Sequence, residues 1–373
     1  MHIVGALEGG GAERWVRDLA PRLQSRGIRT EIVSIYPPRL DAAQMLELGC
    51  AVHHRPKRRG IDPQHFAWLY QLIRRRTPNI VHTHMTAGKY VGRAAAILAR
   101  TPLIVHTEHS PNPLLGREHF LANILSRGTH IVIAFDEHKA ELIRKRERVS
   151  TFEIIRNGLP LSPAPTETER LAARYRLNAS DETVIFGVVA SLQERKNPRL
   201  ALRGFAAMAD DCKIRARLDF FGQGPLRDEL IGLARDLGIL ERVRFHGFRS
   251  DVREFLAGLD VFLTVATHEM APISMLEAMV AQLPIIGTPH PGTIEMVDDG
   301  VNGCVVDWSV ADVTAAMTLA CTNASWRHTC GAAGRKRVER DYDIENIADQ
   351  HVALYRRLMN GSTDGVPNIA QTA

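Results

Sequence analysis

The stretch Thr267–Thr288 reads Thr-His-Glu-Met-Ala-Pro-Ile-Ser-Met-Leu-Glu-Ala-Met-Val-Ala-Gln-Leu-Pro-Ile-Ile-Gly-Thr, and its pattern predicts a loop, a helix and a strand. Pro272 suits the first turn of that helix, where a missing N–H costs nothing. The carboxylates of Glu269 and Glu277 lie eight positions apart on either side of the helix start. Both can therefore reach one pocket.

The start of this helix also predicts an anion site. At roughly 1.5 Å rise per residue, Glu277 lies about a turn and a half into the helix. The N–H groups of Ile273 and Ser274 point toward the same pocket, and a helix N-terminus favours a negative charge. A phosphate beside two acceptors for sugar hydroxyls describes a nucleotide-sugar site. The alternative is a solvated helix start with an incidental second glutamate.

This segment resembles the Glu-x7-Glu signature of the family 4 retaining glycosyltransferases, which have the GT-B fold. The run from Glu277-Ala-Met to Gly303 is similar to the same family in order and spacing. The resemblance implies that Glu277 accepts hydroxyls of the nucleotide ribose and that Glu269 lies beside the donor sugar. Met270-Ala271 stands where the family usually has Gly-Phe.

A second motif, Ala190 to Pro198, follows the first strand of the C-terminal half, where a doubly wound sheet offers a ligand crevice. The family loop reads Gly-Arg-Leu-x-x-x-Lys, and its two cations neutralise the leaving diphosphate. Lys196 fits the lysine, whereas Ser191 replaces the arginine. The adjacent Arg195 is the candidate for the missing charge, with a solvated loop residue as the alternative.

Glycines supply the remaining donor-binding candidates. Gly10 and Gly11 belong to Gly-Gly-Ala-Glu-Arg, which follows the first strand and resembles the family loop that closes over the donor phosphate. The loop lacks the Gly-Lys-Ser/Thr of a Walker motif and the Gly-x-Gly-x-x-Gly of a dinucleotide site. Gly247 and Phe248, after the strand candidate Val243–His246, complete the set that the resemblance implies.

Four histidines end two neighbouring strand candidates: His82, His84, His106 and His109. No carboxylate or cysteine joins them at a typical ligand spacing, so the sequence predicts no metal site. His109 matches the family histidine that borders the donor sugar and its phosphate. We expect the other three to be polar residues of the core or of the cleft wall.

Strand and helix patterns alternate in two series, which predicts an α/β chain of GT-B type with two Rossmann-like doubly wound domains facing a central cleft. The predicted strands are 2–7, 28–35, 80–84, 103–107 and 130–134, then 184–190, 216–221, 243–246, 260–264, 285–287 and 303–306. The predicted parts are an N-terminal acceptor-side domain (1–158), a linker (159–170), a C-terminal nucleotide-sugar domain (171–340), a helix crossing back to the first domain (341–360) and a disordered tail (361–373). Asp341-Tyr-Asp343 is interpreted as a helix cap.

Charge is divided unevenly along the 373 residues. The net charge of +5 combines +10 in residues 1–160 with −5 in the rest. Basic clusters lie at residues 55–59, 74–76 and 144–148, short and without interleaved aromatics, which argues against nucleic acid. They fit an anionic membrane surface or a diphosphate-bearing acceptor, or a solvated face. With no apolar run long enough for a span and no signal-peptide pattern, we expect a cytoplasmic protein, at most peripheral at the inner face of the membrane.

Taken together, the motifs indicate a retaining glycosyltransferase (hexosyl or glycosyl transfer). The donor is a UDP- or GDP-sugar, and the acceptor is a hydroxyl of a lipid-linked, polysaccharide or glycoconjugate intermediate. His109, Glu269 and Lys196 are the catalytic candidates, and no cofactor or metal is expected because cations and helix dipoles replace it. A nucleotide-sugar epimerase or phosphorylase, or a non-catalytic sugar-binding relative, stays open because fold does not fix function.

Overall fold

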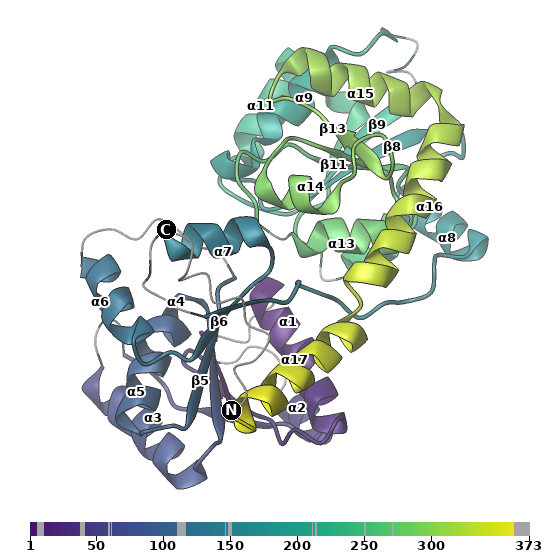
Figure 1. The fold of residues 1–373 in the computed structure, drawn as a ribbon. Helices are drawn as coiled ribbons and strands as arrows, with labels where there is room; N and C mark the ends of the chain where they lie inside the picture. The colour runs from purple at the N-terminus through teal and green to yellow at the C-terminus, as the bar shows by residue number, and fades with distance from the viewer. Residues whose placement is uncertain are drawn as a thin grey trace, which may run out of the picture. The chain divides into compact units, whose positions relative to one another are not determined.

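The structure, a computed structural model, describes residues 1–5, 11–37, 42–58, 60, 62–109, 117–145, 147, 151–210, 212, 215–249, 251–270 and 272–361. The chain forms two compact units (Figure 1). Unit 1 comprises Met1–Pro160 with Asp343–Ala373, and unit 2 comprises Leu161–Tyr342. Each unit is an α/β layer structure with its own parallel sheet, as the sequence predicts.

Unit 1 contains a seven-stranded sheet in the order β3-β2-β1-β4-β5-β6-β7, with every pair parallel. The strands are β1 (His2–Val4), β2 (Glu31–Ser34), β3 (Ala51–His54), β4 (Ile80–His84), β5 (Leu103–Thr107), β6 (Ile131–Ala134) and β7 (Phe152–Ile154). The helices are α1 (Gly11–Ser25), α2 (Ala42–Glu47), α3 (Pro63–Arg76), α4 (Met85–Ala87), the π-helix η1 (Gly88–Gly92), α5 (Arg93–Leu98), α6 (Arg117–Ser126), α7 (Glu137–Arg144) and α17 (Ile344–Met359).

Unit 2 contains a six-stranded parallel sheet in the order β10-β9-β8-β11-β12-β13. The strands are β8 (Val184–Val189), β9 (Ala216–Phe221), β10 (Val243–Phe245), β11 (Val261–Thr264), β12 (Ile285–Gly287) and β13 (Gly303–Val305). The helices are α8 (Glu167–Arg176), η2 (Glu194–Lys196), α9 (Pro198–Ala206), α11 (Arg227–Asp236), η3 (Leu240–Arg242), α12 (Val252–Leu256), α13 (Ile273–Val280), α14 (Pro291–Met296), α15 (Val310–Thr322) and α16 (Ala324–Asp341).

Both sheets reverse their strand order at one point, between β1 and β4 in unit 1 and between β8 and β11 in unit 2. In doubly wound sheets, ligands bind at such a reversal, beside the carboxyl ends of the strands. The strands are apolar runs because helices cover both faces of a parallel sheet. In β9 all six residues are buried, and Arg217 is paired there with Asp219 (Nε to Oδ1, 2.7 Å).

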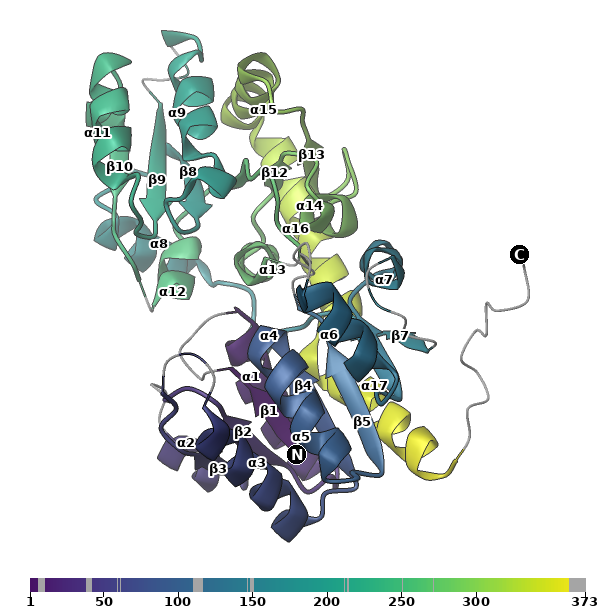
Figure 2. The same ribbon diagram turned by 90° about the vertical axis from the view of Figure 1, so that its left-hand side faces the viewer.

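The terminal helix α17 belongs to unit 1, where it lies beside α1 (Figures 1 and 2). Ile347 and Tyr355 join the same buried cluster as Trp15 and other residues of unit 1. Asp343 caps α17 by accepting a hydrogen bond from the Glu345 N–H (3.0 Å), which confirms the cap prediction for Asp343, whereas Asp341 is the last residue of α16.

Several predicted boundaries differ from the structure. The strands β3 and β7 were not predicted, because both are short and β3 contains two histidines. The helix α8 starts at Glu167, inside the segment predicted as linker, because Thr166 and Glu169 form a reciprocal capping box. Of the predicted strand 2–7, residues 2–4 form β1, and residues 6 and 7 lie outside the described part. The tail from residue 362 onward lies outside it too.

Candidate active site

Two loops meet at the switch point of the unit 2 sheet. One follows β8 and carries Arg195 and Lys196, and the other follows β11 and carries Thr267 and Glu269. The Thr267 N–H and hydroxyl both donate to the Arg195 carbonyl, at 2.9 and 3.2 Å. This backbone tie holds the two predicted motifs together.

The charged side chains of these loops form one cluster. The Lys196 ammonium contacts the Glu269 carboxylate, and Arg195 Nη1 lies 3.3 Å from the same oxygen, Glu269 Oε2. The Lys196 side chain is 15% exposed, whereas that of Arg195 is 52% exposed. The cluster therefore holds two basic side chains and one carboxylate, and the excess of basic groups favours a phosphate.

Burial, and secondarily the Arg195 charge, lower the pKa of Lys196 to about 7. The contact with Glu269 acts in the opposite direction, since a carboxylate favours the charged ammonium. A bound phosphate would do the same. The charge of Lys196 near neutral pH therefore depends on whether an anion occupies the site.

Helix α13 begins beside this cluster. Its N-cap residue is Pro272, and no described side chain caps the helix. The first residues, Ile273 and Ser274, therefore present amide groups at a helix start with no side-chain acceptor, which is an arrangement that binds anions. Pro272 lies just before the helix and not in its first turn, in contrast to the sequence prediction.

Close backbone approaches fix the loop that carries Glu269. The Gly292 N–H donates to the Glu269 carbonyl (2.9 Å), and a Cβ on Gly292 would meet Pro272 Cδ at 2.6 Å. A glycine is therefore required at the start of α14. In the same way, a side chain on Gly222 or Gly224 would collide with the backbone of residues 190–192, which explains this glycine pair without a ligand.

Glu277 is 4% exposed and lies on α13, where Arg253 Nε of α12 is 3.0 Å from its Oε1. Arg253, 43% exposed in its side chain, was missed by the sequence analysis. The structure identifies Arg253 by its contact with Glu277, which lies 24 residues further along the chain, and a separation of that length leaves no periodic pattern in the sequence.

The predicted residues Gly247 and Phe248 follow β10. Gly247 has a φ of 71°, and its carbonyl accepts a hydrogen bond from the Gly222 N–H (2.8 Å). Phe248 is 69% exposed.

The remaining candidates lie in unit 1. Gly11 starts α1, and Gly10 lies outside the described residues. His109 follows β5, and its ring packs between Trp15 (5.4 Å between centroids) and Phe135 (5.2 Å). Burial lowers the pKa of His109 to about 3, so the imidazole is neutral. The structure thus divides the predicted site residues between the units, with eight of them in unit 2.

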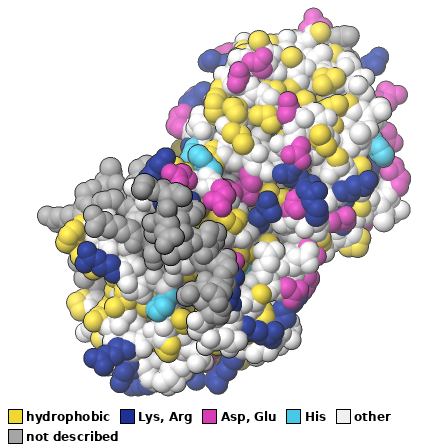
Figure 3. All heavy atoms as spheres, in the orientation of Figure 1, with side chains coloured by type: hydrophobic (Ala, Val, Ile, Leu, Met, Phe, Trp, Pro, Cys, Tyr) yellow, Lys and Arg dark blue, Asp and Glu magenta, His cyan; other side chains and the backbone are white. Residues whose placement is uncertain are grey.

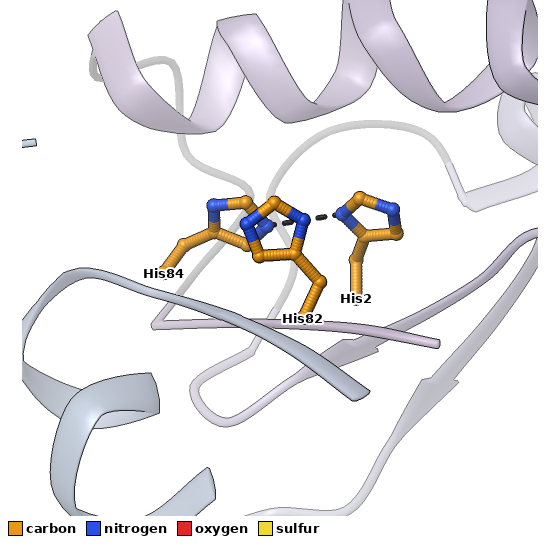
Figure 4. Close-up of side chains that lie close together, drawn as sticks. All are labelled: His2, His82 and His84. Carbon is orange, nitrogen blue, oxygen red and sulfur yellow. Dashed lines mark hydrogen bonds between the residues drawn. The ribbon is translucent and has the colours of Figure 1, made fainter. Parts of the chain in front are cut away.

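The other three histidines named in the sequence analysis are buried, as expected for polar residues of the core. His82, His84 and His106 are each at most 1% exposed. One ring nitrogen each from His2, His82 and His84 lies within 4.8 Å of the others, a spacing at which a metal ion could be considered (Figure 4). Both nitrogens of His82 are, however, within 2.7 Å of hydroxyls, Tyr355 Oη and Thr107 Oγ1. Metal independence stays a prediction.

Unit 1 also holds a cavity of about 740 Å³ at the carboxyl ends of β1, β2 and β4. Its wall is largely apolar and aromatic, with Tyr36, Phe66 and Tyr90, and its polar groups include Lys57 and His65. Met85, in the wall, has a φ of 58°, a conformation that a side chain disfavours. Strained backbone and π-helices such as η1 occur often at functional sites.

Comparison with known proteins identifies the family of the chain. The family "Glycosyl transferases group 1" matches residues 169–337, and "Glycosyltransferase Family 4" matches residues 9–162. The two family models together span most of the chain, which therefore belongs to the family 4, group 1 glycosyltransferases.

Two curated relatives and one solved structure illustrate the likeness. The chain is 34% identical over 192 residues to the lipopolysaccharide core biosynthesis glycosyltransferase LpsE of Rhizobium meliloti (51% of this chain, 55% of that protein). It is 32% identical over 159 residues to the Vi polysaccharide biosynthesis protein VipC/TviE of Salmonella typhi (42% of this chain, 27% of that protein). The matched part of this chain thus spans about half of the length of LpsE and about a quarter of the length of VipC/TviE.

The solved structure is Anabaena Alr3699/HepE in complex with UDP. The TM-score is 0.83 at 19% identity, covering 95% of this chain and 100% of that one. At this identity the likeness shows the fold alone. The same Anabaena protein has also been solved with UDP-glucose.

Proposed function

We propose that this protein transfers a sugar from a UDP-sugar to a hydroxyl of a glycan acceptor, with retention of the anomeric configuration. The observation that carries the proposal is the unit 2 switch point, where Lys196, Arg195 and the start of α13 provide positive charge beside Glu269 and Glu277. The choice of UDP rests on the Anabaena neighbour, which binds UDP and UDP-glucose.

Each residue has a role in this proposal. Lys196, Arg195 and the amides of Ile273 and Ser274 stabilise charge on the leaving diphosphate, the electrostatic contribution that usually dominates such catalysis. Glu277 accepts hydroxyls of the ribose. Glu269 then exchanges its ion pair with Lys196 for a hydroxyl of the donor sugar.

The sugar acquires positive charge as the bond to the diphosphate breaks, and His109 stabilises that centre. The acceptor hydroxyl attacks from the face that the leaving phosphate departs, and the phosphate takes its proton. No step needs a metal ion, since cationic side chains and helix amides replace one.

We propose that the acceptor binds at the unit 1 cavity and that it is a polysaccharide or lipid-linked intermediate. Aromatic walls pack against the apolar faces of sugar rings, and a cavity of about 740 Å³ has the size of a small-ligand pocket. The names of LpsE and VipC/TviE, which refer to lipopolysaccharide core and Vi polysaccharide biosynthesis, support an acceptor of this class.

The direct test is an assay of UDP release from a panel of UDP-sugars, with and without glycan acceptors and with excess EDTA. We expect release that depends on the acceptor, an α-linked product from an α-linked donor, and full activity in EDTA. An altered sugar nucleotide formed without acceptor would instead identify an epimerase. Activity that EDTA abolishes and Mg²⁺ restores would contradict the metal-free site.

Replacing Glu277 with alanine should weaken UDP binding by about 1.5–3 kcal/mol, because the ribose hydroxyls lose a charged acceptor. Isothermal titration calorimetry with UDP measures this change. Glu254→Ala is the matched control: that carboxylate pairs with Arg176 on the surface of the same unit (2.7 Å) and is 58% exposed. Equal UDP affinity in wild type and Glu277→Ala would disprove the ribose assignment.

We further propose that unit 1 meets an anionic lipid surface on the cytoplasmic side of a membrane. Lys and Arg side chains gather on its visible face, together with hydrophobic ones (Figure 3). Arg58, Arg74 and Arg75 are exposed, and Phe120 of α6 is 66% exposed. In the described part of the chain, no helix is long and apolar enough to cross a membrane.

Changing Arg58, Arg74 and Arg75 to serine should weaken binding to vesicles that contain phosphatidylserine by about 3 kcal/mol at low salt, since each basic residue near such a surface contributes about 1 kcal/mol. Vesicle sedimentation measures the binding, which should also fall as salt rises. The matched control changes three exposed arginines of unit 2, at positions 227, 244 and 340. Equal binding of the wild type to neutral and anionic vesicles would argue for an acceptor in solution.

A further inference from the structure

Three histidines of unit 1 form a continuous chain of hydrogen bonds between their rings. His109 Nε2 lies 3.2 Å from His84 Nδ1, and His84 Nε2 lies 3.0 Å from His2 Nδ1. Figure 4 shows the second of these bonds as a dashed line. The chain connects the carboxyl end of β5, where His109 is, with the first residue of β1.

The ring geometry fits hydrogen bonds between the histidines and not a shared metal ion. The rings of His2 and His84 are almost parallel (7°) with centroids 5.2 Å apart, the spacing of two imidazoles joined end to end by one hydrogen bond. An ion held by three histidines needs one lone pair from each ring to meet at a point. His82 has its two nitrogens at Tyr355 Oη (2.5 Å) and Thr107 Oγ1 (2.7 Å).

All three rings are neutral. Burial lowers the pKa of His2 and of His84 well below the usual value for histidine, and it lowers that of His109 to about 3. A neutral imidazole has one N–H and one lone pair on its two nitrogens. Each hydrogen bond of the chain needs one N–H from one ring and one lone pair from the next.

These conditions leave two arrangements. If His109 donates from Nε2, then His84 accepts at Nδ1, donates from its own Nε2, and His2 accepts at Nδ1. If the direction is reversed, all three rings carry the proton on Nδ1. Any mixed arrangement places two protons or two lone pairs face to face in a buried site, which costs the desolvation of those groups.

We propose that His2, His84 and His109 share one tautomer, and that His2 and His84 are positioning residues which decide whether Nδ1 of His109 accepts or donates a hydrogen bond. The role of His109 beside the donor sugar rests on the proposed function. With the protons on Nε2, Nδ1 of His109 presents a lone pair, which accepts from a sugar hydroxyl and favours a positively charged centre. With the protons on Nδ1, the same atom donates.

The test is two-bond ¹⁵N–¹H spectroscopy of the ligand-free protein labelled at histidine, which distinguishes the two tautomers of each ring. We expect His2, His84 and His109 to show the same tautomer, whichever it is. A difference between any two of them would overturn the proposal. This measurement uses the wild-type protein and depends on no assay of activity.

A variant then tests the coupling. His84→Phe keeps a ring at the centre of the chain but removes both hydrogen bonds, so His109 should change from one tautomer to a mixture. The matched control is Tyr355→Phe, which removes a partner of His82 (2.5 Å) and leaves the three-ring chain intact. Persistence of the single tautomer at His109 in a folded His84→Phe protein would overturn the proposal.

A kinetic measurement separates this proposal from the proposed function. We expect His84→Phe to lower kcat for UDP release by at least about tenfold, because a wrong tautomer misplaces a donor or acceptor, with the UDP dissociation constant within twofold of wild type. An unchanged kcat together with a changed tautomer would overturn the positioning role. A wild-type protein that releases UDP from no sugar nucleotide would refute the proposed function, while the spectra would still decide the tautomers.

Discussion

Replacing Lys89 with methionine should destabilise unit 1 by about 3–5 kcal/mol, the usual cost of leaving buried charges without their partner. Lys89 Nζ lies 2.8 Å from Glu108 Oε2 and also contacts the Glu147 carboxylate. Arg93 Nη1 reaches Glu147 at 3.0 Å. The side chains of all four residues are at most 7% exposed, so water cannot replace the lost ammonium.

Urea denaturation followed by circular dichroism measures the change in the free energy of unfolding. Lys145→Met is the matched control, because that lysine is 69% exposed and pairs with Glu141 on the surface (3.4 Å). It should cost less than about 0.5 kcal/mol. The double variant Lys89→Met/Glu108→Gln should recover part of the loss. A Lys89→Met protein within about 1 kcal/mol of wild type would contradict a buried ion cluster.

The stability that this ion cluster contributes should depend on pH in a definite direction. Burial alone would raise the pKa of Glu108, but His106 and Lys89 outweigh it and lower that pKa well below 4.5. Burial likewise opposes ionisation of Glu147, and Arg93 and Lys89 lower its pKa. These carboxylates therefore stabilise the fold above the unfolded pKa, and the contribution is lost as the pH falls through the folded pKa. Without the Lys89 ammonium, Glu108 and Glu147 should be protonated at a higher pH than in the wild type, so the deficit of Lys89→Met should be smaller at pH 4 than at pH 7.

This cluster also shows why charge runs are hard to interpret from sequence. Glu147 lies within the basic segment 144–148, which suggested a solvated surface or an anion-binding patch. Its side chain is 1% exposed because its partners, Arg93 and Lys89, come from distant parts of the chain. No local sequence pattern predicts that Glu147 pairs with Arg93 and Lys89.

Continuous apolar runs, in contrast, predicted the two parallel sheets well. Runs such as β8 and β9 are buried almost throughout, so their strand pattern is plain in the sequence. The strand β3 was missed because its four residues, Ala-Val-His-His, are only half-buried. Edge strands need less apolar surface, and the sequence signal weakens accordingly.

The candidate site was predictable where a motif is local and not where it depends on distant contacts. Glu269, Ile273, Ser274 and Glu277 belong to one stretch, and the resemblance to a family added Lys196. The contact of Arg253 with Glu277 and the hydrogen bonds of His2 were not foreseen. They join residues on different elements, and their distances appear only once the sheets are assembled.

Replacing Lys196 with alanine should lower kcat/KM for UDP-sugar turnover by about 10²–10³, or roughly 2.7–4 kcal/mol, the usual effect of removing one group that stabilises transition-state charge. The substitution should leave the fold intact. Glu269 keeps Arg195 as a partner (3.3 Å), and its side chain is 18% exposed, so its charge stays solvated.

Arg199→Ala is the matched control, since that cation lies three residues further on and is engaged by Glu194 and Glu229. It should leave kcat/KM within about twofold. If Lys196→Ala also kept kcat/KM within about twofold of wild type, Lys196 would not be a residue of the active site.

The pH dependence of UDP affinity adds a second signature of Lys196. A lysine whose pKa is lowered to about 7 by burial and by Arg195 is charged below that pH and loses its charge as the pH rises through it. A bound diphosphate restores the charge, so UDP binding at pH 8 should take up a proton, seen as a dependence of the calorimetric enthalpy on the buffer. Lys196→Arg keeps its charge throughout and should not show this uptake. Equal proton uptake in wild type and Lys196→Arg would assign the titration to another group, and would leave Lys196 without contact to the phosphate.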